Sequence, residues 1–187
     1  MHMTILAFDE INAMTRISMD RAEEEGDSAR LLDDVEAILI DSYVRGVKAA
    51  GEMLGEELDV DVILMMETIE LKIDGKTYRD RLIDYFNGYD TAEAQRVAET
   101  EAHRVANAGI SDGATAFKKK SGKGVVKVWN TMLDDRVRET HEYLEQESVP
   151  LDAEFYTIDG DHAPYPGAFQ DAANNVNCRC FINLRIV

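Results

Sequence analysis

The fold of this chain is decided by its last part, where VKVWNT (Val126–Thr131), DDRVRETH (Asp134–His141) and NCRCFI (Asn177–Ile182) follow one another. The short run of β-branched residues in the first segment predicts a strand. Polar and apolar residues alternate over 178–187, which predicts a final strand. The single Trp, both Cys and all three Pro lie in this part of the chain. We therefore expect specific structure and specific chemistry here.

The rest of the carboxy-terminal part completes a small mixed unit. A helix is expected from about Leu133 to Glu145, and a second strand over 155–158. Residues 159–177 are rich in Gly, Pro and Asn and predict a long loop. The expected order is strand, helix, strand, loop and strand, which indicates a short antiparallel sheet with one helix packed on it.

The preceding residues show helical periodicity. An apolar stripe from Leu31 to Leu54 predicts the clearest helix. Gly46, Gly51 and Gly55 on this helix are spaced to let a neighbouring helix approach closely. A helix is expected over 5–17, followed by a linker over 21–26. Further helices are expected over 61–73, over 77–87 with Thr77 as its N-cap, and over 111–120. Between the last two, a helix over 90–109 is expected to begin at Asp90 with Glu93 and to end at Gly109. The fold class is therefore α+β, with a helical region over 1–120 and a small α+β domain over 121–187.

Composition and charge restrict the function. The chain has 187 residues, 45% hydrophobic and 30% charged, which is the balance of a folded protein. Its net charge is -17, and residues 1–117 carry 11 basic against 26 acidic residues. Such a surface repels phosphate, so non-specific nucleic-acid binding by the whole chain is not expected. No apolar run is long enough to cross a membrane and no secretory signal is visible, so we expect the protein to stay in the cytoplasm where it is made.

One segment has the opposite charge. Residues 118–127 carry five lysines and no acid: Lys118, Lys119, Lys120, Lys123 and Lys127. The plain interpretation is a solvated helix end followed by a glycine turn, and the alternative is a nucleic-acid contact. The Gly-Lys-Gly within this segment lacks the other features of a phosphate-binding loop, so it predicts no nucleotide site.

The candidate site combines the expected helix and the last strand. Asp134–Asp135 precede Arg138 by three to four residues, so one carboxylate is expected to pair with this guanidinium on one helix face. His141 lies one turn further along. Cys178 and Cys180 point to one side of a strand, and if that side faces the helix, all these groups converge.

Three interpretations compete for this cluster. His141, His162, Cys178 and Cys180 are the candidate ligands of a zinc ion, which prefers thiolate and imidazole. Alternatively, the thiols pack as small apolar residues and His141 bonds to backbone, which the residues favour, so no metal or cofactor is expected. A nucleophile and base pair from Cys and His is the third interpretation, but no oxyanion motif surrounds them, so no catalytic residue is assigned.

The order of these residues carries a resemblance. The motif residues are Trp129, Thr131, Asp134, Asp135, Arg138, His141, Asn177, Cys178, Arg179 and Cys180. Together with 149–155, Pro166–Gly167, and Ala98–Glu101 with Asn107 upstream, they resemble the phage minor head proteins similar to the F protein of bacteriophage Mu. The resemblance covers about residues 90–187. Some relatives look like zinc binders, with Cys-x-x-Cys where this chain has 138–141 and His-Pro where it has 175–176. These departures remove candidate ligands here.

The resemblance implies a role in head morphogenesis. We expect a minor capsid protein of a tailed phage or prophage, not an enzyme, which associates with the portal protein, and with capsid or scaffold protein, during prohead assembly. It would reside in the cytoplasm of the host bacterium during assembly and then in the virion head. Residues 1–120 would be the portal or scaffold adaptor. A DNA-contacting head protein acting through Lys118–Lys127, and a zinc-stabilised binding module, are the alternatives.

Overall fold

The computed structural model describes residues 5–73 and 75–187, and the side chains from residue 9 onward apart from residue 74. Five helices come first: α1 (Ile5–Glu25), α2 (Ser28–Leu54), α3 (Val62–Ile69), α4 (Tyr78–Asn87) and α5 (Thr91–Ser121). The remaining elements are β1 (Val125–Asn130), α6 (Glu139–Glu142), β2 (Ser148–Pro150), β3 (Phe155–Tyr156), β4 (His162–Ala163), α7 (Ala172–Asn175) and β5 (Phe181–Ile186). The expected α+β class, with helices first and a short antiparallel sheet last, is confirmed.

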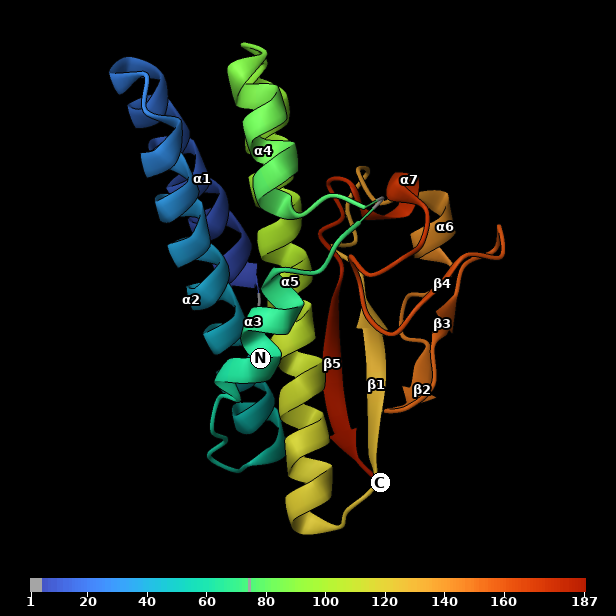
Figure 1. Cartoon of the computed structure of the whole chain (residues 1–187). Coiled ribbons are helices and arrows are strands. Elements are labelled where there is room, and N and C mark those ends of the chain that lie inside the picture. The colour runs from blue at the N-terminus through green and yellow to red at the C-terminus, as the bar shows by residue number, and fades with distance from the viewer. Residues whose placement is uncertain (1–4, 74) are drawn as a thin grey trace.

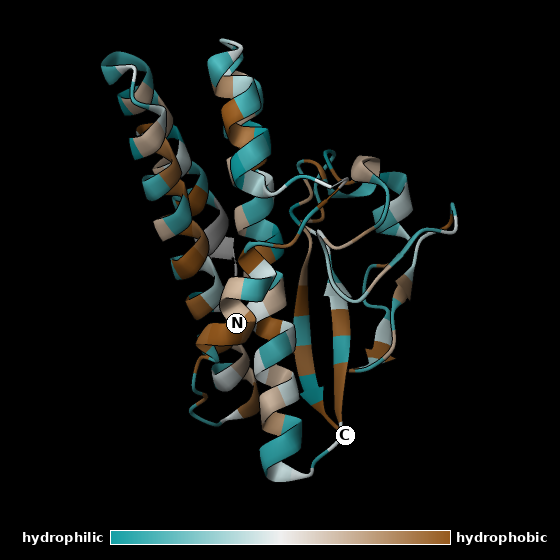
Figure 2. Ribbon diagram, in the orientation of Figure 1, coloured by the Kyte–Doolittle hydropathy of each residue, from teal (hydrophilic) through white to brown (hydrophobic). Residues whose placement is uncertain are grey.

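The long helix α5 lies at the centre of the molecule, between the other long helices and the sheet (Figure 1). The sheet has the order β2-β1-β5 and is antiparallel, with Trp129 opposite Ile182. A separate antiparallel pair joins β3 and β4. Hydrophobic and hydrophilic residues alternate along β5 in Figure 2, as the sequence indicated.

The two hydrophobic cores meet along α2 and α5. The first core contains apolar residues of α1 to α5, including the fully buried Leu31 and Leu39. The second joins Ala50, Ile110 and Phe117 of the helices to residues of the sheet and its loops. This core therefore contains residues on both sides of the predicted boundary at 120.

Glycines allow the closest helix contact. A Cβ on Gly109 would lie 2.3 Å from the carbonyl oxygen of Tyr43, and one on Gly46 would lie 2.2 Å from that of Ala106. The expectation that Gly46 permits close approach is confirmed. The expectation that Gly109 ends a helix is wrong, because it serves this crossing instead, and α5 is one helix through Ser121.

Asn107 of α5 closes the free edge of the sheet. Its Nδ2 donates to the carbonyl of Cys180 at 3.2 Å, and its Oδ1 accepts from the N–H of Ile182 at 3.2 Å. These are bonds of the kind that a further strand would make where β5 begins. One amide side chain thus satisfies backbone groups that an open edge leaves unpaired.

A buried ionic cluster on α5 supports the loop before α7. Glu101 and Arg104 are each 1% exposed and pair at 2.8 Å, while Arg81 reaches Glu101 at 2.7 Å. Arg104 also donates to the carbonyl of Thr68 at 2.9 Å. Gly167, at φ +89°, lies so close that a Cβ there would be 3.0 Å from Arg104 Cα. The Pro-Gly loop is therefore fitted against α5.

Several boundaries differ from the predictions. The helix expected from Leu133 to Glu145 is wrong: only the single turn α6 forms, because Leu133 has φ +55° and the Asp134 carboxylate accepts from the N–H of Arg136 in a turn. The first helix continues through the expected linker to Glu25, and α3 ends at Ile69 instead of 73. The short elements β2, β4 and α7 were not predicted.

Within the described residues, no helix combines the length and apolar character that crossing a membrane requires.

Candidate functional site

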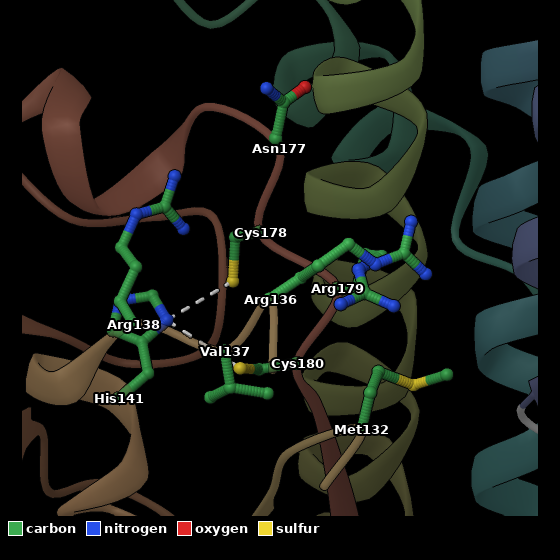
Figure 3. A pocket seen from close by; sticks show the side chains of 9 residues that line it. All are labelled: Met132, Arg136, Val137, Arg138, His141, Asn177, Cys178, Arg179 and Cys180. Atoms are coloured by element: carbon green, nitrogen blue, oxygen red, sulfur yellow. Dashed lines mark hydrogen bonds between the residues drawn. The ribbon is translucent and has the colours of Figure 1, made fainter. Parts of the chain in front are cut away.

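Three side chains of the kinds that can bind a metal ion meet between α6 and the start of β5. His141 comes from α6, and Cys178 and Cys180 come from the segment that leads into β5 (Figure 3). His141 Nδ1 lies 3.5 Å from the Sγ of each cysteine, and the donor atoms of the three residues all lie within 4.8 Å of one another. All three residues are buried and both cysteines are free thiols. The predicted convergence of thiols and imidazole is therefore present, although on a shorter helix than expected.

Aromatic rings hold His141 in place. Its ring stacks on Phe169 with centroids 5.3 Å apart and meets the edge of Trp129 at 5.5 Å. Trp129 in turn packs against Phe155 at 5.1 Å. His141 Nε2 is buried and makes no hydrogen bond to another described residue. Packing, rather than a hydrogen bond at Nε2, thus directs Nδ1 towards the two sulfur atoms.

The two thiols titrate as a pair. The hydrogen bond from Cys180, helped by His141 and opposed by burial, holds the pKa of the Cys178 thiol well below its usual range. The same hydrogen bond, together with burial, raises the pKa of Cys180. The pair therefore loses its first proton much more easily than its second.

Arginines surround this cluster. Arg179 makes two hydrogen bonds to the Asp134 carboxylate at 2.8 and 2.6 Å, and these bonds lower the pKa of Asp134 to about 2. Arg138 donates to the carbonyl of Val176. The predicted pairing of Arg138 with Asp134 or Asp135 is wrong, because Arg179 takes Asp134 and the helix that would align the pair does not form. Asp135 is exposed.

The other predicted motif residues shape the loops beside the cluster. The N–H of Thr131 donates to Glu145 at 2.5 Å, and the Thr131 hydroxyl accepts from the N–H of Leu133. Asn177, at φ +56°, donates its N–H to the hydroxyl of Thr100 on α5 at 3.4 Å. The hydrogen bonds of Thr131 and Asn177 therefore fix the two loops that flank the cluster.

His162 does not join the cluster. Its Nδ1 lies 2.6 Å from a Glu154 carboxylate oxygen, and its side chain is 36% exposed. Its Nε2 faces Gln170 at 3.3 Å. The suggestion that His162 supplies a fourth ligand beside His141 is therefore wrong, because β4 places it with Glu154 instead.

The lysine segment is split by the fold. Lys118, Lys119, Lys120 and Lys123 are exposed at the end of α5, where Lys120 pairs with Glu56. The suggestion that Lys127 takes part in a nucleic-acid contact is wrong, because this side chain is fully buried in β1.

Lys127 instead supports the loops over the sheet. Its Nζ donates to the carbonyls of Ala153 and Pro164 at 2.7 and 2.8 Å and lies 5.5 Å from the centre of the Phe155 ring. Burial lowers the pKa of Lys127 to about 8. This role was missed, although a single lysine within a β-branched run was a visible signal.

Asp161 organises the loop before α7 and was also missed. Its carboxylate accepts from the N–H groups of His162, Gln170 and Asp171 and from Asn174 Nδ2, at 2.8 to 3.3 Å. Burial alone would raise the pKa of Asp161, but these hydrogen bonds outweigh it and lower the pKa. The Asn-rich segment that predicted a loop therefore also supplies, in Asp161 and Asn174, side chains that order this loop.

The donor set suits zinc better than it suits a harder cation. Two thiols and an imidazole are zinc ligands, and two Zn–S bonds of about 2.3 Å with a Zn–N bond of about 2.0 Å place nitrogen roughly 3.5 Å from each sulfur. The observed separations agree. A cavity of about 10 Å³ beside the three donors, bordered by Met132, is at the lower limit of the space that holds one water molecule. Three protein donors and one small adjoining space are thus available.

Comparison with known proteins identifies the family. A family model described as phage Mu protein F like protein matches residues 66–183, which include α5, the whole sheet apart from the end of β5, and the cluster. The chain belongs to the phage Mu protein F-like family. The match begins in α3, earlier than the expected start near residue 90.

Two curated proteins are similar to this chain over part of their length. The chain is 35% identical over 109 residues to NAD(+)--arginine ADP-ribosyltransferase EFV of Enterococcus faecalis, covering 57% of this chain and 22% of that protein. It is 36% identical over 89 residues to minor head protein GP7 of Bacillus phage SPP1, covering 48% of this chain and 28% of that protein. The chain thus spans about a quarter of the length of these relatives. No solved structure matches it.

Proposed function

We propose that this Mu F-like protein is a minor head protein of a tailed phage or prophage, present in few copies and associated with the portal vertex during prohead assembly. The observation that carries the proposal is the family match over 66–183. The name of the SPP1 relative, a minor head protein, supports it. The role is structural; the transferase activity in the other relative's name belongs to a protein of which this chain spans 22%.

In this proposal the helical region 1–120 is the adaptor to the portal or scaffold, and the mixed unit 121–187 is a small α+β domain next to it. Two features of the helices support this assignment. The region carries most of the acidic charge, and α3 exposes apolar side chains, with Val62 at 61% and Ile63 at 74%. Exposed apolar groups framed by charge are typical of protein interfaces. Assembly would occur in the host bacterium, and the protein would then reside in the virion head.

Size-exclusion chromatography with light scattering tests the portal contact. The protein is mixed with the portal protein of the same phage or prophage, and we expect co-elution at a defined ratio. Ile63→Asp should abolish co-elution because it places a charge on the proposed contact surface. Ile158→Asp, at a comparably exposed position of 61% against 74% for Ile63, is the matched control and should leave co-elution unchanged. Separate elution of the wild-type protein would contradict portal association, and loss with the control alone would contradict the adaptor assignment.

A zinc-stabilised module is a second candidate, favoured by the His141–Cys178–Cys180 geometry. In it, these three residues hold the ion, and the ion would join α6 to the start of β5. Bound zinc would supply structural cross-linking, which raises stability where a core is small.

Metal content decides this second candidate. Protein purified without added metal should contain about one zinc per chain by mass spectrometry of the elements. Cys178→Ser should reduce this strongly, whereas His162→Gln, which alters a histidine outside the cluster, should not. A zinc centre would be excluded if the wild-type protein contains no metal, does not bind added cobalt, and has the same melting temperature with and without a chelator.

A further inference from the structure

A second, larger cavity lies next to the thiol–imidazole cluster. Its volume is about 440 Å³, within the range of ligand sites in proteins, and it opens between α1, α5 and the two loops that carry the motif residues. Arg136, Arg138 and Arg179 border both this cavity and the small one beside the cluster. Figure 3 shows the side chains of Arg136 and Arg179 together on the side away from His141.

The charge of this cavity is opposite to that of the protein. Three guanidinium groups and one carboxylate, that of Glu99, border it, and the Asp134 carboxylate pairs with Arg179 and Arg136; three positive against two negative charges leave a small positive excess in a chain with a net charge of -17. Arg179 is fixed by Asp134 and Arg138 by the carbonyl of Val176, so both are held in position. Such an arrangement of guanidinium groups suits an oxyanion, which accepts several charge-assisted hydrogen bonds.

Arg136 has capacity for a further partner. Its side chain is 74% exposed, and its contact with Asp134 is long, at 3.5 Å. A guanidinium has five N–H donors, and at an exposed pair of this length little energy is lost when it turns to another acceptor. Arg136 is therefore free to close on an anion that enters the cavity.

The wall of the cavity that is formed by α1 and α5 offers hydrogen-bond acceptors, so a ligand must present a hydrogen-bond donor to it. Asn12 of α1 borders the cavity, and its Oδ1 is buried without a hydrogen-bond partner among the described residues. Glu99 also lies on this wall and accepts from Gln95 at 2.7 Å. A peptide offers both a carboxylate for the arginines and N–H groups for this wall. A nucleic-acid backbone offers repeated phosphates, which Glu99 and the net charge of the chain oppose.

We propose that this arginine-lined cavity binds a protein segment through the carboxylate of an acidic residue. The partner is recognised by its carboxylate and adjacent peptide N–H groups. This goes beyond the portal contact assigned to the helices, because the cavity lies on the motif loops and does not depend on the exposed face of α3.

Nuclear magnetic resonance titration tests the proposal on the whole chain. The probes are the tripeptide Gly-Glu-Gly with blocked ends, the uncharged Gly-Gln-Gly with blocked ends, and a ten-nucleotide oligothymidylate. We expect the acidic tripeptide alone to shift the amides of 99–103 and 177–179 in a saturable way. Arg136→Gln should weaken its binding at least about threefold, as expected for a partly exposed ion pair. Arg185→Gln, which removes an exposed arginine of β5, should leave binding unchanged.

Three outcomes would overturn the proposal. Absence of shifts around the cavity with the acidic tripeptide would exclude a carboxylate site. Equal effects of the two arginine substitutions would show that only general charge matters. Binding of the oligonucleotide at these amides without binding of the acidic tripeptide would assign the cavity to phosphate. Failure of portal co-elution would leave each of these outcomes unaffected, so the two proposals fail separately.

Discussion

Residues 5–121 and residues 122–187 each contribute to a hydrophobic core, but polar side chains have different roles in the two regions. In the helices, apolar stripes pack against one another, and Leu39 and Val35 are buried among similar residues. Around the sheet, single polar side chains bind backbone groups: Lys127 binds two carbonyls, and Asn107 binds one carbonyl and one N–H at the free edge where β5 begins. Volume-conserving apolar changes should therefore be tolerated in the first region, and loss of one polar group should be costly in the second.

The largest effect is expected at Lys127. Lys127→Ala leaves the carbonyls of Ala153 and Pro164 buried without a donor and creates a cavity, so we expect a loss of about 3 kcal/mol of unfolding free energy. Urea denaturation followed by Trp129 fluorescence measures it. Lys123→Ala, at an exposed position, is the control and should change stability by less than about 0.5 kcal/mol. A cost below about 1 kcal/mol at Lys127 would remove the proposed difference between the regions.

A pair of conservative substitutions sharpens the comparison. Asn107→Leu has nearly the same volume but loses both bonds to β5, so we expect a loss of about 2 kcal/mol. Leu39→Met in the helical core conserves volume and should lose less than about 1.5 kcal/mol. The measurement is again the urea midpoint. Equal costs would mean that the sheet edge does not depend on the amide.

The pH dependence of stability tests the part of α5 that faces the motif loops. Burial, with the charge of Arg179, lowers the pKa of His103 to about 3. Between pH 6.5 and 3 the unfolded chain binds a proton that the folded chain does not, so unfolding free energy falls as pH decreases, by up to about 1.4 kcal/mol per pH unit. His103→Asn should flatten this slope in urea titrations at pH 7, 6 and 5. An unchanged slope would show that folding does not lower the pKa of His103.

The smallest effect is expected at a surface ion pair of the helices. Arg45 pairs with Glu10 and Asp41, and all three side chains are well exposed. Arg45→Gln should change the unfolding free energy by less than about 1 kcal/mol, because solvent screens such pairs. A loss above about 2 kcal/mol in thermal denaturation would show that charge pairing, and not apolar packing, holds α1 on α2.

The same difference explains how much the sequence could predict. The helix stripes follow from local periodicity, and the caps at Thr77 and Asp90 follow from local residue type; these predictions are confirmed. The first and last strands of the carboxy-terminal part are confirmed as strands. The convergence of His141 with the two cysteines was also predicted. Predicted helix boundaries were wrong where a tertiary contact decided the structure. Gly109, for example, permits a helix crossing, although a glycine at the end of an apolar stripe predicts the end of a helix.

The missed features depend on partners far away in sequence. Arg179 lies 45 residues from Asp134, and no local spacing indicates that it displaces Arg138 as the partner. Lys127 reaches Pro164 across 37 residues. The large cavity combines α1 with loops near the end of the chain, so neither its volume nor its excess of arginine is visible from composition.

Hydrogen–deuterium exchange of Asn107→Leu tests the central claim most directly, namely that single polar contacts stabilise the sheet on α5 in addition to the shared apolar core. The account predicts that amides of β1 and β5 lose protection about tenfold or more, while those of α2 over 31–43 remain within about twofold of wild type. Equal loss of protection in α2 and in both strands would contradict it, because the chain would then open as one unit held by its shared apolar cores.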